Sequence, residues 1–142
     1  MIDWRTPPTE DGQVQAQRIA QAVNEYYGQR EVIMLIVMTG AVLPAAWLAS
    51  RLKMPMMLDF VHATRYAGTT EGGDIEFRVP PRINLQGRDV LVVDDIYDIG
   101  LTLEMIEDYC HARHAASVNS AVLVRKIHDR PTTDRPPRFI GM

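Results

Sequence analysis

The clearest chemical signal in the sequence is the run VLVVDDIYDIGLTL. Its four apolar residues are followed by two adjacent carboxylates, Asp94 and Asp95. A third carboxylate, Asp98, and then Gly100 stand just before a predicted helix. A strand that turns into a helix in this way directs free main-chain N–H groups, from about Asp98 to Thr102, toward one point in front of the positive end of the helix dipole. We therefore predict that this turn binds a phosphate monoester.

The adjacent pair Asp94 and Asp95 calls for a different role. Successive strand residues point to opposite faces of a sheet, so we expect the two carboxylates to leave the strand on opposite sides. Carboxylates repel a phosphate, but they accept hydrogen bonds from hydroxyl groups and bind Mg²⁺. A lone Asp at a helix start is more often a simple cap. The whole constellation favours a site for a sugar hydroxyl or a cation.

Two other classes of protein place acidic residues after an apolar strand. A receiver domain carries its paired acids near the N-terminus and has a phosphorylated Asp and a Lys well downstream, which does not fit the acids that follow here. A Walker-B strand needs an upstream G-x-x-x-x-G-K-[ST] loop, and the sequence has none. Both alternatives are therefore set aside.

The elements that must position this turn follow from the apolar pattern. Helical spacing and continuous apolar runs predict alternating helices and strands with a glycine-rich loop at 63–74, and right-handed crossovers join them. The predicted helices are 11–27, 42–52 and 101–114, and the predicted strands are 32–38, 56–61, 75–79, 90–93 and 118–124. This order is typical of an α/β fold with a mainly parallel central sheet and flanking helices, which binds ligands at the carboxyl ends of its strands.

The composition limits what else the chain can be. Its 142 residues, 46% of them hydrophobic, suit a single domain over 1–142, with a proline-rich loop or tail at 127–142. A net charge of −3 argues against a nucleic-acid partner. No apolar run is long enough for a membrane helix, and the N-terminus lacks the charged-then-apolar layout of a signal peptide. A single cysteine, Cys110, cannot form an internal disulfide, so we expect a reducing, cytoplasmic setting.

At its acidic turn the sequence closely resembles the phosphoribosyl-pyrophosphate motif of the type I phosphoribosyltransferases, in particular their hypoxanthine-guanine branch. The resemblance extends from about 31 to 142 and implies the fold of that family. It places Thr39 and Gly40 at the turn that contacts pyrophosphate. The segment ATRYAG resembles the start of the family's catalytic loop, with Tyr66 at the matching tyrosine and Arg65 where serine is common. Lys126 occupies the place of the lysine that recognises the purine's exocyclic oxygen.

The resemblance also implies a reaction. The phosphoribosyl group of phosphoribosyl pyrophosphate would pass to hypoxanthine or guanine, giving IMP or GMP and pyrophosphate in purine salvage. Asp94 and Asp95 would hold the ribose hydroxyls directly or through Mg²⁺, and Asp98 would take a proton from the base. Lys126 would donate to the 6-oxo group and so disfavour adenine. The 5′-phosphate would lie against the turn residues Ile99, Gly100, Leu101 and Thr102. A homo-oligomer, dimer or tetramer, is expected.

The sequence departs from the family at two places. Ile99 stands where a small hydroxyl residue is usual, so one hydrogen bond to the phosphate is missing. The final RPPRFIGM resembles the segment before the family's last strands, and the hood that clamps the purine is expected to be incomplete. Three hypotheses stay open: an active or weakened phosphoribosyltransferase, a non-catalytic module that binds nucleotides or phosphoribosyl pyrophosphate, and a truncated inactive homologue.

Overall fold

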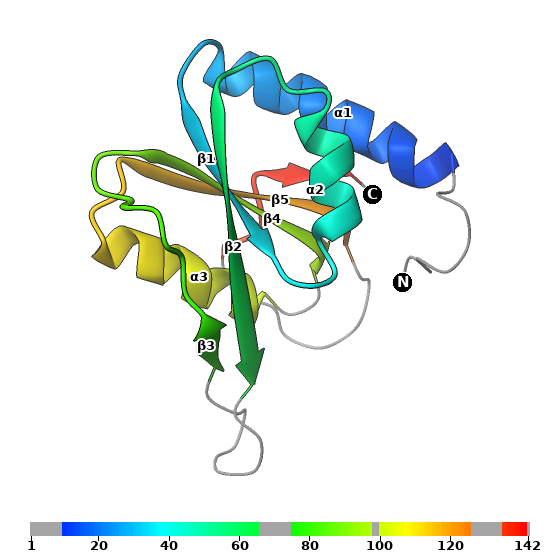
Figure 1. The fold of residues 1–142 in the computed structure, drawn as a ribbon. Coiled ribbons are helices and arrows are strands. Elements are labelled where there is room, and N and C mark those ends of the chain that lie inside the picture. Colours follow the sequence, from blue (N-terminus) through cyan, green and yellow to red (C-terminus); the bar gives the residue numbers. More distant parts are fainter. Residues whose placement is uncertain (1–9, 66–74, 98–99, 126–134, 142) are drawn as a thin grey trace.

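Six strands form one sheet in the order β3-β2-β1-β4-β5-β6 (Figure 1). The structure is a computed structural model that describes residues 10–65, 75–97, 100–125 and 135–141. The elements in chain order are α1 (Glu10–Tyr27), β1 (Val32–Val37), α2 (Val42–Ala49), β2 (Met56–Arg65), β3 (Ile75–Val79), β4 (Asp89–Tyr97), α3 (Leu101–Ala112), β5 (Ser117–Arg125) and β6 (Phe139–Ile140). All neighbouring strands pair in parallel except β3, which is antiparallel to β2. The predicted α/β fold with a mainly parallel sheet is confirmed.

The centre of the sheet is the most apolar part of the chain. All six residues of β1 are buried, as the continuous run VIMLIV predicts for a strand covered on both faces. Its neighbour β4 buries Val90, Leu91, Val92 and Val93. Helix α1 covers part of the sheet with a buried stripe that includes Ile19, Val23 and Tyr27. None of the helices in the described part of the chain is long and apolar enough to cross a membrane.

The order of the strands predicts a crevice at the carboxyl ends of the central strands. From β1 the chain crosses through α2 to β2, while from β4 it crosses through α3 to β5 in the opposite direction. Because both crossovers are right-handed, α2 and α3 cover opposite faces, as Figure 1 shows. Sheets of this kind bind ligands where the direction reverses, at the carboxyl ends of the two central strands. Those strands here are β1 and β4.

Two strands run further than the apolar pattern predicts. Strand β4 was expected to end at Val93, but it continues to Tyr97 because β5 pairs with it to the end, with Asp94 opposite Val122. Strand β2 was expected to end at Val61, but it continues to Arg65 because β3 pairs with its last residues. The pairing strand supplies hydrogen bonds that a local pattern of apolar residues does not reveal.

The final segment contains a strand that the sequence pattern misses. Phe139–Ile140 forms β6 in parallel with β5, within the region predicted as a proline-rich loop or tail. The ring of Phe139 is buried near the rings of Tyr26 and Tyr27. Residues 126–134 and 142 of that predicted tail lie outside the described residues.

Candidate active site

The turn after β1 touches the acidic pair of β4. A Cβ atom on Gly40 would lie 2.6 Å from Oδ2 and 2.8 Å from Cγ of Asp95. Such an approach is possible only for a residue without a side chain, because non-bonded heavy atoms normally stay about 3.5 Å apart. The structure thus brings together two segments that are distant in sequence, at the crevice where the strand order predicts a ligand.

The turn itself presents main-chain donors to this crevice. Its ends are held by hydrogen bonds from Met38 N to Val61 O, 2.8 Å, and from Ala41 N to Val37 O, 3.1 Å. The peptide bond between Met38 and Thr39 is cis. The N–H groups of Thr39 and Gly40 donate to no other described residue, and Thr39 is exposed. Two free N–H groups at a strand end suit an anionic ligand.

The acidic pair lies inside the last part of β4, partly withdrawn from water. Oδ1 of Asp94 accepts a hydrogen bond from the N–H of Asp95 at 2.8 Å. Among the described residues no Lys or Arg forms an ion pair with either carboxylate. Burial, followed by the hydrogen bond to Asp95 and its charge, holds the pKa of Asp94 well above its ordinary value. Within the described part of the chain, no cationic side chain balances the negative charge of the pair.

This electrostatic cost predicts a stabilising substitution. Because the pKa of Asp94 is higher in the folded than in the unfolded chain, its stabilising contribution is present below the unfolded value near pH 4 and is lost as the pH rises through the folded value. Asp94→Asn keeps the acceptor for the Asp95 N–H and removes the charge. Without Mg²⁺, its melting temperature at pH 8 is expected to exceed that of the unsubstituted chain by about 3 °C, or ~1 kcal/mol.

The measurement is a series of thermal melts between pH 4 and pH 8. The gain should shrink toward pH 4, where the unsubstituted Asp94 is also protonated. Asp108→Asn is the control, because Asp108 is an exposed carboxylate on α3 that already pairs with Arg135. An Asp94→Asn chain that is less stable than the unsubstituted chain at every pH would contradict the prediction.

The predicted phosphate turn ends in an open helix N-terminus. Gly100 lies in the left-handed region with φ of 87° and forms the N-cap of α3, without a side-chain capping bond. The first bond of the helix runs from Glu104 N to Gly100 O at 2.9 Å, so the N–H groups of Leu101 and Thr102 have no partner within the helix. Glycine suits this position because a side chain at positive φ is strained. This end of α3 can therefore receive a phosphate.

Several predicted site residues lie outside the described residues, and their roles stay predictions. They are Tyr66, Asp98, Ile99 and Lys126. Arg65 is the last residue of β2, and only its backbone is described. The strand register nevertheless pairs Tyr97 with Arg125 at the ends of β4 and β5. Asp98 and Lys126 are the residues that directly follow these two partners in sequence.

The donor set of the crevice fits Mg²⁺. Among the described residues no group of three or more His, Cys, Asp or Glu side chains could hold a metal ion by itself. Mg²⁺, however, usually keeps several waters and binds one or two carboxylates together with substrate phosphates. The pair Asp94 and Asp95 supplies such carboxylates. Cys110 is not a nucleophile here, because burial and then the charge of Glu107 raise the pKa of its thiol to about 12.

One buried polar residue of the sheet was not singled out from the sequence. The carboxylate of Asp59 in β2 is 8% exposed and accepts hydrogen bonds from the N–H groups of Phe60, Arg82 and Ile83. It ties the chain between β3 and β4 to the sheet. A charged residue inside the apolar run MMLDFV was the signal that could have identified it, because buried carboxylates require partners.

Comparison with known proteins places this chain in a family. The family model described as "Phosphoribosyl transferase domain" matches residues 11–140. The hypoxanthine-guanine-xanthine phosphoribosyltransferase of Tritrichomonas foetus is 30% identical over 132 residues, which cover 93% of this chain and 72% of the relative. The hypoxanthine-guanine phosphoribosyltransferase of Staphylococcus epidermidis is 26% identical over 133 residues, which cover 93% of this chain and 74% of that relative.

Solved structures agree with the sequence relatives. A crystal structure of a hypoxanthine-guanine phosphoribosyltransferase from Bacillus anthracis, with a HEPES molecule in its active site, superposes with a TM-score of 0.86 at 26% identity. The match covers 94% of this chain and 79% of that one. The glycine turn, the acidic pair and the open helix N-terminus thus stand on the fold of such enzymes, and the chain belongs to the type I phosphoribosyltransferase family, in its hypoxanthine-guanine branch.

Proposed function

We propose that the chain is a phosphoribosyltransferase of purine salvage. It transfers the phosphoribosyl group of phosphoribosyl pyrophosphate to hypoxanthine or guanine, and the products are IMP or GMP and pyrophosphate. The observation that carries this proposal is the contact between the Gly40 turn and the Asp95 carboxylate, because it joins a main-chain anion site to hydroxyl and cation acceptors in one crevice. The relatives named hypoxanthine-guanine phosphoribosyltransferase support the choice of base.

In this proposal the sugar-phosphate half of the substrate binds along the crevice. The N–H groups of Thr39 and Gly40 receive the pyrophosphate. The carboxylates of Asp94 and Asp95 accept the ribose hydroxyls, directly or through Mg²⁺, and their negative charge faces the positive charge that develops on the ribose. Mg²⁺, when bound, neutralises charge on the leaving pyrophosphate.

The 5′-phosphate binds at the turn that opens α3. The residues that line it in this proposal are Ile99, Gly100, Leu101 and Thr102. Main-chain N–H groups at a helix N-terminus, together with the positive end of the helix dipole, stabilise a phosphate there. Ile99 has no side-chain hydroxyl, so the hydrogen bonds to the phosphate come from main-chain N–H groups and from Thr102.

The base half of the reaction is assigned to residues that follow β2, β4 and β5. Asp98 accepts the proton that leaves the purine nitrogen during its attack on the ribose. Lys126 donates to the 6-oxo group, which adenine lacks. Arg65 and Tyr66 are assigned to the start of the family's catalytic loop, as the resemblance of ATRYAG implies. Each of these roles is a proposal that rests on sequence position.

The proposal is tested by a spectrophotometric assay of hypoxanthine, guanine, xanthine and adenine with phosphoribosyl pyrophosphate and Mg²⁺. We expect turnover of hypoxanthine or guanine and none of adenine, because a donor-only lysine repels an amino group. Binding of phosphoribosyl pyrophosphate without turnover of any base would instead support a regulatory module or an inactive homologue. Absence of that binding would contradict the assignment of the phosphate turn.

We also propose that the enzyme is a homo-oligomer, a dimer or tetramer. Leu58, Phe60 and Val79 are 48%, 46% and 41% exposed, although all three are apolar. Leu58 and Phe60 share one face of β2, and the pairing of Val79 with His62 places Val79 on that same face. Such an exposed apolar face at a sheet edge suits contact with a second copy.

Light scattering after size exclusion tests this assembly. Phe60→Glu is expected to shift the chain to the mass of a monomer, because a charge is costly in an apolar interface. Glu25→Gln, an exposed change on α1, should leave the mass unchanged. A Phe60→Glu chain that keeps the oligomeric mass would rule out this face.

The cytoplasmic location is likewise our proposal, and it rests on the unpaired Cys110.

A further inference from the structure

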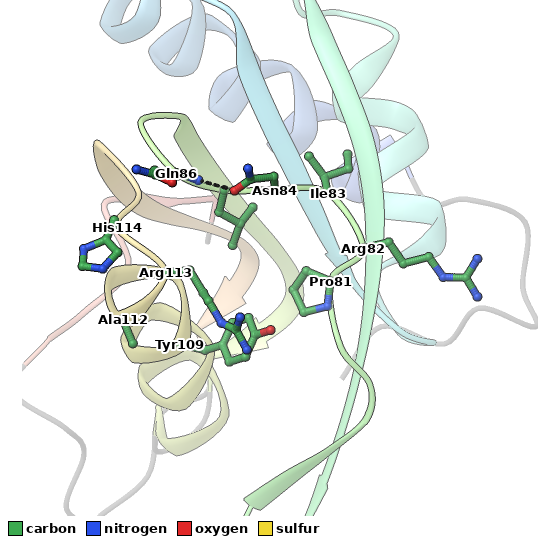
Figure 2. A pocket seen from close by; sticks show the side chains of 10 residues that line it. Pro81, Arg82, Ile83, Asn84, Gln86, Tyr109, Ala112, Arg113 and His114 are labelled. Carbon is green, nitrogen blue, oxygen red and sulfur yellow. Dashed lines mark hydrogen bonds between the residues drawn. The ribbon is translucent and has the colours of Figure 1, made fainter.

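A second hollow lies at the end of the sheet opposite to the candidate active site. It is bounded by the chain 81–86, which leads from β3 to β4, and by the last residues of α3 with His114 (Figure 2). Its volume is about 540 Å³, within the range of about 300–1,000 Å³ that is usual for small-molecule sites. A hydrogen bond from Gly87 N to His114 O, 2.9 Å, joins its two walls just before β4 begins. We call it the α3 hollow.

The central side chain of the α3 hollow is Arg113. Its guanidinium carbon lies 4.9 Å from the centre of the Tyr109 ring, and Figure 2 shows the two side chains in contact. Among the described residues, none accepts a hydrogen bond from this guanidinium or forms an ion pair with it. Stacking on an aromatic ring holds the planar fork in place while its N–H groups stay free. The Arg113 guanidinium is therefore positioned to bind an anion.

Apart from the buried carboxylate of Asp59, which accepts hydrogen bonds from the N–H groups of Arg82 and Ile83, the other groups around the hollow are cationic or neutral. Its charged and titratable lining residues are Arg82, Arg113, His114 and the phenol of Tyr109, and no carboxylate is among them. Figure 2 shows Arg82 directed away from Arg113, so we assign it no contact. The amide of Asn84 accepts the Gln86 N–H at 3.1 Å, which fixes this turn and leaves the Asn84 amino group available as a donor. The donors thus outnumber the acceptors.

The end of a helix normally disfavours anions, because its last carbonyl groups carry partial negative charge. Here the carbonyl groups of Tyr109, Cys110 and His111 already accept hydrogen bonds. Tyr109 O and Cys110 O accept the Arg113 N–H, His111 O accepts the His114 N–H, and Cys110 O also accepts the Ala115 N–H. The left-handed conformation of His114, with φ of 63°, makes this closing turn possible. Three of these carbonyl groups are therefore bonded within the turn, and the Arg113 guanidinium lies over the Tyr109 ring that lines the hollow.

We propose that the α3 hollow is a second, non-catalytic binding site for a small phosphate monoester. A phosphate monoester carries close to two negative charges and three acceptor oxygens at neutral pH, which matches the fork of Arg113, the imidazole of His114 and the amides of Asn84 and Gln86. The site is separate from the phosphate turn, because the two lie at opposite ends of α3.

The position of the hollow connects it to the elements of the active site. Tyr109 packs edge-on against Phe77 of β3, with ring centres 4.8 Å apart. This contact joins α3, whose first residues form the phosphate turn, to the strand that follows the proposed catalytic loop. A phosphate bound to Arg113 would therefore contact the side chain that stacks on Tyr109, where α3 packs against β3.

The test is a titration of the full chain with glycerol 3-phosphate, followed by the amide resonances in ¹⁵N NMR spectra at constant ionic strength. We expect one saturable response at Gln86, Arg113 and His114, and a separate response at Leu101 and Thr102. Arg113→Gln should weaken the first response about tenfold and leave the second unchanged. Arg18→Gln, which removes an exposed arginine of α1, should change neither response.

A second variant tests whether the effect of Arg113→Gln is indirect. His114→Asn keeps a residue that tolerates positive φ and removes the imidazole, so it should also weaken only the response of the hollow. A response of the hollow that is absent in the unsubstituted chain, or that is unchanged in both variants, would overturn the proposal. The response at Leu101 and Thr102 reports on the phosphate turn independently, so the two assignments can fail separately.

Discussion

Replacing Asp98 by asparagine is expected to lower kcat about 10²- to 10⁴-fold, the range typical of a lost general base. The amide has the size of the carboxylate but cannot take a proton from the purine nitrogen. The sugar-phosphate contacts assigned to Thr39, Gly40 and the acidic pair do not involve Asp98. Binding of phosphoribosyl pyrophosphate with Mg²⁺ should therefore stay nearly unchanged, so the loss should appear in kcat and not in the dissociation constant.

Two measurements check this result: steady-state kinetics with hypoxanthine, and calorimetric titration with phosphoribosyl pyrophosphate and Mg²⁺. The pH profile of kcat adds a third readout, because its acidic limb should disappear with the base. Asp108→Asn is the matched control, since it removes an exposed carboxylate of α3. A variant with normal turnover would remove Asp98 from this role.

The fold could be predicted from the sequence where the signal for an element lies within that element and at its ends. Strand β1 was predicted because the seven apolar, largely β-branched residues 32–38 are typical of a strand covered on both faces, and the structure gives it as Val32–Val37. The start of α2 at Val42 and the bounds of β3 at Ile75–Val79 agree with the predictions, because glycine and proline mark their ends. Helix ends were less accurate: α2 and α3 stop at Ala49 and Ala112, earlier than the apolar spacing suggests.

Features that depend on distant pairing could not be read from local pattern. The extension of β4 to Tyr97 depends on hydrogen bonds to β5. Strand β6 depends on a close fit, since a Cβ atom on Gly141 would lie 2.5 Å from Leu123 O. Arg138 adds a contact over the ring of Tyr26 at 4.7 Å. A two-residue strand with little apolar sequence around it carries no periodic signal.

The candidate site also has one part that could be predicted from local sequence and one part that could not. The phosphate turn was predicted because a strand, a glycine and a helix start follow one another in sequence, and its open N–H groups are a local property. The role of the acidic pair was predicted from residue type, and that of Gly40 was implied separately by the resemblance to the family. Their contact is a tertiary property, because it arises only when β1 and β4 become neighbours in the sheet. Burial of Asp94, which lies beside residues of α1, α2 and β5, raises its pKa and is likewise a tertiary property.

That contact predicts a large effect of a single methyl group. In Gly40→Ala, the new Cβ atom would lie 2.6 Å from Oδ2, 2.8 Å from Cγ and 3.0 Å from Oδ1 of Asp95. The carboxylate or the turn must move by about 1 Å to restore contacts of about 3.5 Å. Displacements of this size at a reacting centre cost up to about 10²-fold, so kcat/KM for phosphoribosyl pyrophosphate should fall between about 10- and 100-fold.

A double-mutant cycle separates this clash from a general disturbance of the turn. The free energy of unfolding is measured in urea for the unsubstituted chain, Gly40→Ala, Asp95→Ala and the double variant. If the methyl group acts on the Asp95 side chain, Gly40→Ala should destabilise the unsubstituted chain more than the Asp95→Ala chain, with a coupling energy of at least ~0.5 kcal/mol. An equal cost in both backgrounds would mean that the backbone of the turn, and not the carboxylate, requires glycine at this position.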